Sequence, residues 1–240
     1  MILAALIGIV SCGPGPAAPC TTPSQTKAVP LRIMPLGDSI TYGSGSSDGG
    51  GYRLPLEKRL AQQHDVRVDF VGSLHDGPLT DADHEGHGGY TVDQIRAGVD
   101  GWLATSQPDV ILLHLGINDL NRGQGPGAAD RLVALVDRIH EDQPTAFVLV
   151  QGLIPTTGEL ESQAQAFNTT VRGAASAHQY RWVEPPALTA GEMADRLHPN
   201  DLGYGRMAEA FGMGLDQVML EGHSTLPPGG QTGCSTTPQG

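Results

Sequence analysis

Short apolar runs alternate with amphipathic segments about five times between residues 31 and 220. The run from Val110 to Leu115 is apolar at all but one position, which suits a parallel strand covered on both faces. Residues 128–141 instead space their apolar side chains at helical intervals. Strands that alternate with helices form a parallel sheet joined by right-handed crossovers. The alternation therefore predicts an α/β fold, with a five-stranded parallel sheet between two layers of helices.

The boundaries of the elements follow from periodicity and from turn residues. We expect strands over 31–36, 66–72, 110–115, 146–150 and 180–183. We expect helices over 51–63, 91–104, 128–141, 159–177 and 202–220. Thr91 is a suitable N-cap for the second of these helices. Residues 73–90 are crowded with Asp, His and Gly, so we expect a long loop there.

The chain begins with a segment that resembles a secretion signal. Residues 1–10 are apolar but too few to span a bilayer as a helix, and Ser11-Cys12 follows them as in a lipoprotein cleavage box. No cation precedes Lys27, so either the true start lies upstream or the segment is not a signal. We expect bacterial-type export to a secreted or cell-surface location, with lipidation of Cys12 left open.

Composition divides the chain into a domain and two flanks. Residues 1–30 combine the signal-like segment with a linker rich in Pro and Thr, and residues 223–240 form a polar tail rich in Pro, Gly and Thr. The catalytic domain is expected over 31–222. Of the three cysteines, Cys20 and Cys234 lie in the flanks, and their pairing would fit an oxidising compartment.

The charge balance limits the partners of the chain. A net charge of −12 argues against nucleic acid, which is bound largely through Lys and Arg contacts to phosphate. It also disfavours attraction to anionic lipid surfaces. No Cys-x-x-Cys or His-Glu-x-x-His spacing indicates a zinc site. We expect a monomer with no stable membrane insertion beyond an anchor at Cys12.

Four polar segments fall at the carboxyl ends of the expected strands or in the loops after them. They are Ser39, Gly88-Gly89-Tyr90-Thr91, Gly116-Ile117-Asn118-Asp119, and the pair Asp195 and His198. Open α/β sheets place their chemistry at this edge. Taken singly, the segments around Ser39 and Asn118 are also typical of turns, and the last is typical of a helix start capped by Asn200 or Asp201.

Together, these residue types suit acyl transfer. A serine hydroxyl such as that of Ser39 is a weak nucleophile and needs a base, which His198 can provide. Asp195, three residues earlier, can accept a hydrogen bond from the other ring nitrogen and fix the tautomer. The N–H groups of Ser39 and Gly89 and the amide of Asn118 can converge on a tetrahedral oxyanion.

The same four segments, in this order, resemble the sequence blocks of the SGNH, or GDSL-type, hydrolases. The resemblance spans residues 35–200 and implies a three-layer α/β/α sandwich of the flavodoxin type, with no cofactor and no metal. It implies a catalytic triad of Ser39, Asp195 and His198, and an oxyanion hole made by Ser39, Gly89 and Asn118. Gly88 is adjacent, but Gly89 is chosen because Thr91 lies two residues beyond it, as in the family.

The flanking residues resemble carbohydrate esterase family three in particular. They are Arg32–Thr41, Phe70-Val71-Gly72-Ser73, Glu85–Thr91 and His198-Pro199-Asn200-Asp201-x-Gly203-Tyr204. This resemblance implies a secreted acetylxylan esterase that acts on an acetylated plant polysaccharide. Two alternatives stay open: a lipase or lysophospholipase with the same machinery, and a carbohydrate-binding protein on a degenerate hydrolase scaffold.

Three features have plainer interpretations beside functional ones. The polar cluster over 81–87 can hold a divalent cation, but its spacing is not that of an EF-hand, and a solvated loop is favoured. His114 lies in an apolar run and is interpreted as a satisfied core residue. Trp102 and Trp182 can stack on sugars, but both lie in expected elements and are assigned to the core.

Overall fold

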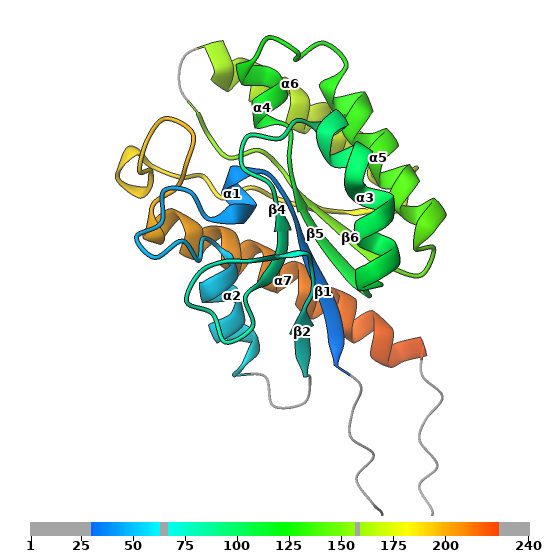
Figure 1. Ribbon diagram of the computed structural model, residues 1–240. Helices are drawn as coiled ribbons and strands as arrows, with labels where there is room; N and C mark the ends of the chain where they lie inside the picture. The colour runs from blue at the N-terminus through cyan, green and yellow to red at the C-terminus, as the bar shows by residue number, and fades with distance from the viewer. Residues whose placement is uncertain (1–29, 63–66, 157–158, 226–240) are drawn as a thin grey trace, which may run out of the picture.

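The computed structural model describes residues 30–62, 67–156 and 159–225. Within them, a mostly parallel sheet lies between two layers of helices (Figure 1). The strands are β1 (Leu31–Gly37), β2 (Val68–Phe70), β3 (Leu74–His75), β4 (Asp83–Gly86), β5 (Val110–His114), β6 (Phe147–Gln151) and β7 (Arg181–Val183). The helices are α1 (Ser39–Tyr42), α2 (Arg53–Leu60), α3 (Val92–Ser106), α4 (Ile117–Asn121), α5 (Ala128–Asp142), α6 (Glu159–Ala174), the 3₁₀ helix η1 (Ala190–Glu192) and α7 (Asp201–Thr225).

The sheet has seven strands where the sequence predicts five, because one parallel position is divided between β2 and β4 and because the short strand β3 adds an antiparallel edge. The order is β3-β4-β1-β5-β6-β7, and β2 also pairs with β1. Both β2 and β4 run parallel to β1, with Val68 opposite Leu31 and Glu85 opposite Leu36. The chain leaves the sheet after Phe70 and returns at Asp83 on the same side of β1. Counted as positions, the parallel part has five, and the fold is the predicted α/β/α sandwich.

The expected loop over 73–90 is therefore wrong in its central part. Residues 74–75 and 83–86 form β3 and β4, which pair antiparallel. His84 and Glu85 are fully buried, so the polar cluster over 81–87 is not a solvated loop. Burial and the neighbouring Arg53 guanidinium lower the pKa of His84 to about 3. Polar side chains in β4 obscured the strand because alternation of apolar and polar residues is absent there.

The helices cover the two faces of the sheet in separate groups. Helices α2 and α7 pack against each other on one face, whereas α3, α5 and α6 pack side by side on the other (Figure 1). Every residue of β5 is buried, as the apolar run predicts. At the start of α3, the Thr91 N–H donates to Gln94 Oε1 at 2.9 Å, in agreement with the predicted N-cap.

His114 ends β5 and is fully buried, so its assignment to the core is confirmed. The expectation of a satisfied side chain is wrong, because neither ring nitrogen has a hydrogen-bond partner among the described residues. Burial lowers the pKa of His114 to about 4. The imidazole is thereby kept neutral in a position where a charge would be costly.

The flanking predictions concern parts of the chain outside the described residues. Cys12, Cys20 and Cys234 lie there, as do nearly all of the linker and most of the tail. Within the described ranges, no helix combines the length and the apolar character that a membrane span requires.

Candidate active site

Ser39 lies where the central strand β1 turns directly into the one-turn helix α1. The turn is tight: a Cβ on Gly37 would lie 2.2 Å from the His114 carbonyl oxygen, so only glycine fits. Asp38 caps the helix, and its Oδ1 accepts from the Ile40 N–H at 3.0 Å. This geometry presents the half-buried Ser39 hydroxyl at the carboxyl edge of the sheet.

The structure brings the other two predicted triad residues to this hydroxyl. Ser39 Oγ lies 2.9 Å from His198 Nε2, and His198 Nδ1 lies 2.8 Å from Asp195 Oδ2. Both partners sit on the loop between η1 and α7, which Asn200 ends by accepting from the Leu202 N–H at 3.0 Å. Catalytic loop and helix cap thus coexist in one short segment. The side chains of His198 and Asp195 are 22% and 56% exposed, so solvent reaches the relay.

Asp195 is held as a carboxylate that orients the imidazole. Its Oδ1 accepts from the N–H groups of Leu197 and His198 at 2.7 and 2.8 Å. Burial opposes ionisation, but the hydrogen bonds from the His198 ring and from these two N–H groups outweigh it and lower the pKa of Asp195. Since a carboxylate only accepts, His198 Nδ1 carries the proton and Nε2 is free to take one from Ser39.

The predicted oxyanion donors lie on three neighbouring segments. Asn118 is buried on α4, directly after β5, and its Nδ2 donates to the Tyr90 carbonyl oxygen at 3.0 Å and to Asp38 Oδ2 at 3.3 Å. The amide therefore links the residue before Ser39 to the residue after Gly89. Gly89 has a φ of 79°, a left-handed conformation that favours glycine.

Asp38 is a site residue that the sequence analysis did not single out. It is fully buried beneath Asn118, and burial raises its pKa to about 7, although the Ile40 N–H and His198 act in the opposite direction. A carboxyl group that accepts an amide hydrogen bond beside a nucleophile helps to place that amide. The Gly-Asp-Ser turn was a signal for this residue, but a turn aspartate is normally solvated.

Arg53 is a second residue without a clear sequence signal. Its guanidinium is fully buried and donates to five backbone carbonyl oxygens at 2.9 to 3.3 Å. The acceptors are Thr41, Tyr42, Gly49, Asp76 and Ala82. Arg53 thus joins α1, the glycine-rich loop and the segment between β2 and β4 through hydrogen bonds to their backbone carbonyl groups.

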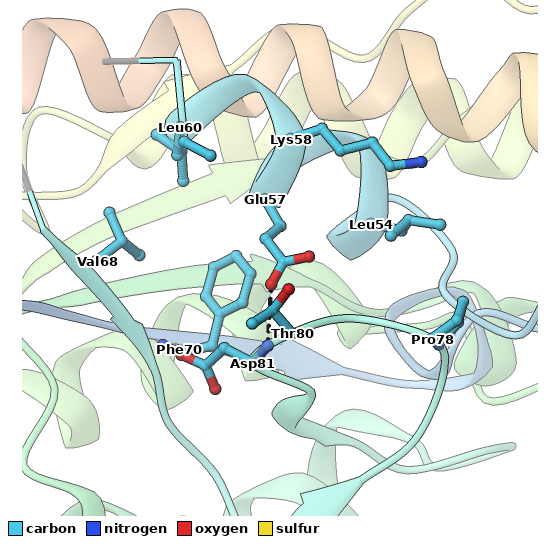
Figure 2. A pocket seen from close by; sticks show the side chains of 10 residues that line it. Leu54, Glu57, Lys58, Leu60, Val68, Phe70, Pro78, Thr80 and Asp81 are labelled. Carbon is cyan, nitrogen blue, oxygen red and sulfur yellow. Dashed lines mark hydrogen bonds between the residues drawn. The ribbon is translucent and has the colours of Figure 1, made fainter. Parts of the chain in front are cut away.

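One cavity lies beside the triad, and another lies away from it. A cavity of about 330 Å³ adjoins the relay and is lined in part by Leu188, Met193, Asp195 and Arg196. A second cavity of about 470 Å³ lies between α2, β2 and the segment before β4, and no predicted catalytic or oxyanion residue lines it (Figure 2). There Glu57 Oε1 accepts from the Asp81 N–H at 2.9 Å. In the described part of the chain, no three His, Cys, Asp or Glu side chains gather as metal ligands.

The arrangement has the parts that acyl transfer requires. A hydroxyl faces a base, the base is oriented by a carboxylate, and an amide donor stands on a neighbouring helix. The sequence-predicted site residues lie just after the carboxyl ends of β1, β4 and β5 or in the loop before α7, and hydrogen bonds join the three triad residues to one another and Asn118 to Tyr90, the residue after Gly89.

Comparisons with known proteins agree with this geometry. A family model described as the GDSL-like lipase/acylhydrolase family matches residues 36–206. A multidomain esterase from Ruminococcus flavefaciens is 30% identical over 87% of this chain. The match covers 31% of that esterase, so the chain spans about a third of the length of this curated relative.

Solved structures share this fold over most of the chain. A family 3 carbohydrate esterase from Clostridium thermocellum is 33% identical, with a TM-score of 0.72 over 80% of this chain and 99% of that one. A family 3 carbohydrate esterase from Talaromyces cellulolyticus is 26% identical, with a TM-score of 0.68 over 80% of this chain and 99% of that one.

Proposed function

Because the chain belongs to the GDSL-like lipase/acylhydrolase family, as an SGNH esterase most like carbohydrate esterase family three, we propose that it removes O-acetyl groups from a plant polysaccharide such as acetylxylan. The observation that carries the proposal is the relay from Ser39 through His198 to Asp195, at 2.9 and 2.8 Å. The reaction passes through an acetyl-serine intermediate and acts on substrate outside the cell.

Acylation begins with attack of Ser39 Oγ on the acetyl carbonyl carbon, while His198 Nε2 takes the hydroxyl proton. The carbonyl oxygen becomes an oxyanion, which accepts hydrogen bonds from the N–H groups of Ser39 and Gly89. Asn118 Nδ2 becomes the third donor by exchanging its longer hydrogen bond, the one to Asp38 Oδ2 at 3.3 Å, for one to the oxyanion. His198 then gives its proton to the departing sugar oxygen, and the C–O bond of the ester breaks. Asp195 stabilises the imidazolium that exists between these two transfers.

Deacylation repeats these steps with water as the nucleophile. His198 takes a proton from water, the hydroxide attacks the acetyl-serine carbonyl, and the same donors bind the second oxyanion. The proton returns to Ser39 Oγ as acetic acid leaves, and the acid ionises to acetate in solution. Each residue therefore acts twice, and no group outside the triad and the oxyanion donors is needed for proton balance.

The accessibility of the relay supports a polymeric substrate. His198 and Asp195 are in part exposed to solvent, so an ester carried on a bulky chain can approach Ser39 without full enclosure. The hollow beside Asp195 can receive part of the glycan. Two structural relatives above 25% identity are themselves described as family 3 carbohydrate esterases, which favours a sugar ester over a lipid ester.

The test is acetate release from acetylated xylan, measured beside hydrolysis of 4-nitrophenyl acetate and 4-nitrophenyl octanoate, for wild type and Ser39→Ala. We expect acetate release by wild type, none by the variant, and an unchanged fold by circular dichroism. Cleavage of the small acetate alone would keep the serine mechanism and reject xylan as substrate. Faster cleavage of the octanoate would favour the lipase or lysophospholipase alternative. Glycan binding without any acetate release would favour the binding-protein alternative.

A further inference from the structure

The loop between β4 and α3 carries the predicted oxyanion donor Gly89, and a partly buried assembly of side chains holds this loop. At the start of the loop, the His87 N–H donates to the Gly37 carbonyl oxygen at 2.9 Å, next to the Ser39 turn. The Tyr90 N–H then donates to the His87 carbonyl oxygen at 3.1 Å, which closes a turn over residues 87–90. Gly89 lies inside this turn, so the orientation of its peptide depends on what fixes His87 and Tyr90.

A buried carboxylate fixes the His87 imidazole from one side. Glu85 has no exposed surface, and its two oxygens accept from Ser73 N at 2.8 Å, Ser73 Oγ at 2.7 Å and His87 Nε2 at 2.8 Å. A buried carboxylate is costly unless its acceptor sites are filled. Ser73 fills two of them, and the third donor comes from the oxyanion loop. Glu85 therefore links the loop to β4 through its hydrogen bond with His87.

Two aromatic rings fix the same imidazole on its faces. The ring of His87 stacks on Tyr90 with centroids 4.8 Å apart and planes 20° apart, and on Trp102 of α3 at 4.4 Å and 17°. Gly98 makes room for this, because a Cβ there would lie 2.4 Å from Trp102 Cζ2. The two contacts join the loop to α3, and the His87 side chain is only 14% exposed.

The assembly reaches two of the three oxyanion donors. Tyr90, one member of the stack, follows Gly89 and offers the carbonyl oxygen that accepts from Asn118 Nδ2 at 3.0 Å. A shift of Tyr90 would move the Gly89 peptide and the Asn118 amide together. We propose that His87, held by Glu85, Tyr90 and Trp102, is a positioning residue that sets both donors for the oxyanion. This rests on the proposed serine esterase function.

The imidazole combines two properties that its common replacements separate. Phenylalanine can stack between Tyr90 and Trp102 but cannot donate to Glu85, and it leaves that buried carboxylate one donor short. Glutamine can donate to Glu85 but presents no aromatic face. If both contacts set the loop, each replacement impairs the oxyanion site, and the two impairments have different structural origins.

The experiment compares His87→Gln and His87→Phe with wild type, using His75→Gln as the matched control. His75 lies on the paired strand β3, bonds Asp83 at 2.7 Å, and is 74% exposed. The readouts are kcat and KM for 4-nitrophenyl acetate, the inhibition constant of methylboronic acid, which forms a tetrahedral adduct on serine, and the melting temperature. We expect kcat and boronate affinity to fall in parallel by roughly tenfold to a hundredfold, with KM nearly constant, on the scale of a displaced donor.

A structural role alone would lower the melting temperature and leave kcat per folded molecule and boronate affinity unchanged, which would overturn the proposal. If His87→Phe fails to fold, His87→Gln decides. A further readout is the double variant with Asn118→Ala, in which the His87→Gln loss should be smaller than in wild type because the two act on one site. A wild type that cleaves no acetyl ester would overturn both proposals, whereas an active wild type with unaffected variants overturns this one alone.

Discussion

At the scale of single residues, Asn118 is the predicted oxyanion donor that a substitution can test directly, because it donates through its side chain and the other two predicted donors are backbone groups. Its amide is held by the Tyr90 carbonyl oxygen and by Asp38 before any substrate binds. We expect Asn118→Ala to lower kcat for 4-nitrophenyl acetate by roughly a hundred- to a thousandfold with little change in KM. Thr105→Ala on α3, whose hydroxyl donates only to the Gly101 carbonyl oxygen of its own helix at 3.0 Å, is the control. A near-native kcat for Asn118→Ala would remove this residue from the mechanism.

Asp38 makes a testable contribution to the dependence of stability on pH. Its pKa is raised from 3.8 to about 7 by burial, so between these values the folded state binds more protons than the unfolded state. Stability from this group is therefore lost as pH rises from about 4 to about 7. Relative to wild type, the unfolding free energy of Asp38→Asn should rise by up to roughly 1.4 kcal/mol per pH unit across this window. Urea denaturation of both proteins at several pH values measures this difference in unfolding free energy. A difference that stays constant with pH would contradict the raised pKa of Asp38.

The sequence predicts the residues that carry chemistry better than those that hold them. Ser39 and Asn118 follow the ends of apolar strands, and Asp195 and His198 lie three residues apart in the loop before the last helix, a placement that packing alone does not explain. Glu85 gave no such signal, because its role depends on donors from Ser73 and His87 that only the folded chain brings near. Long-range pairing of polar groups leaves no periodic trace in the sequence.

At the scale of elements, Arg53 connects segments that no regular hydrogen-bond ladder joins. Lysine keeps the charge but has three donors against the five that Arg53 uses. We expect Arg53→Lys to cost roughly 2 to 6 kcal/mol of unfolding free energy, since two or more buried carbonyl groups lose their partners. Thermal and urea unfolding check this, with Arg172→Lys on the exposed face of α6 as a control that should change little. Equal stability of Arg53→Lys and wild type would show that water or rearrangement satisfies these carbonyls.

Elements with strong periodicity were predictable, and those built from tertiary contacts were not. The helix expected over 128–141 and the strand over 110–115 agree with α5 and β5 to within about a residue at each end. β4 was missed because its register on β1 comes from Glu85 opposite Leu36, while its own residues are polar. The one-turn helices α1 and α4 are too short to show a period at all.

At the scale of the whole molecule, both described ends lie away from the predicted site. β1 enters the sheet at Leu31, and α7 ends near the same edge, where Glu221 pairs with Arg181 at the start of β7 at 2.7 Å (Figure 1). The triad lies at the opposite, carboxyl edge. This agrees with a catalytic domain that needs neither flank, although the boundaries at 31 and 222 stay a prediction.

We therefore expect a chain of residues 30–225 to keep kcat/KM for 4-nitrophenyl acetate within about twofold of the full chain, because both described ends lie at the edge opposite the predicted site and the described hydrophobic core is formed within this range. Its melting temperature should be unchanged for the same reason. The measurement is steady-state kinetics and thermal unfolding of both chains, under reducing and non-reducing conditions. A lower melting temperature only without reductant would indicate that a Cys20–Cys234 bond stabilises the fold. A loss of kcat/KM at constant melting temperature would instead place one of the removed flanks at the substrate site.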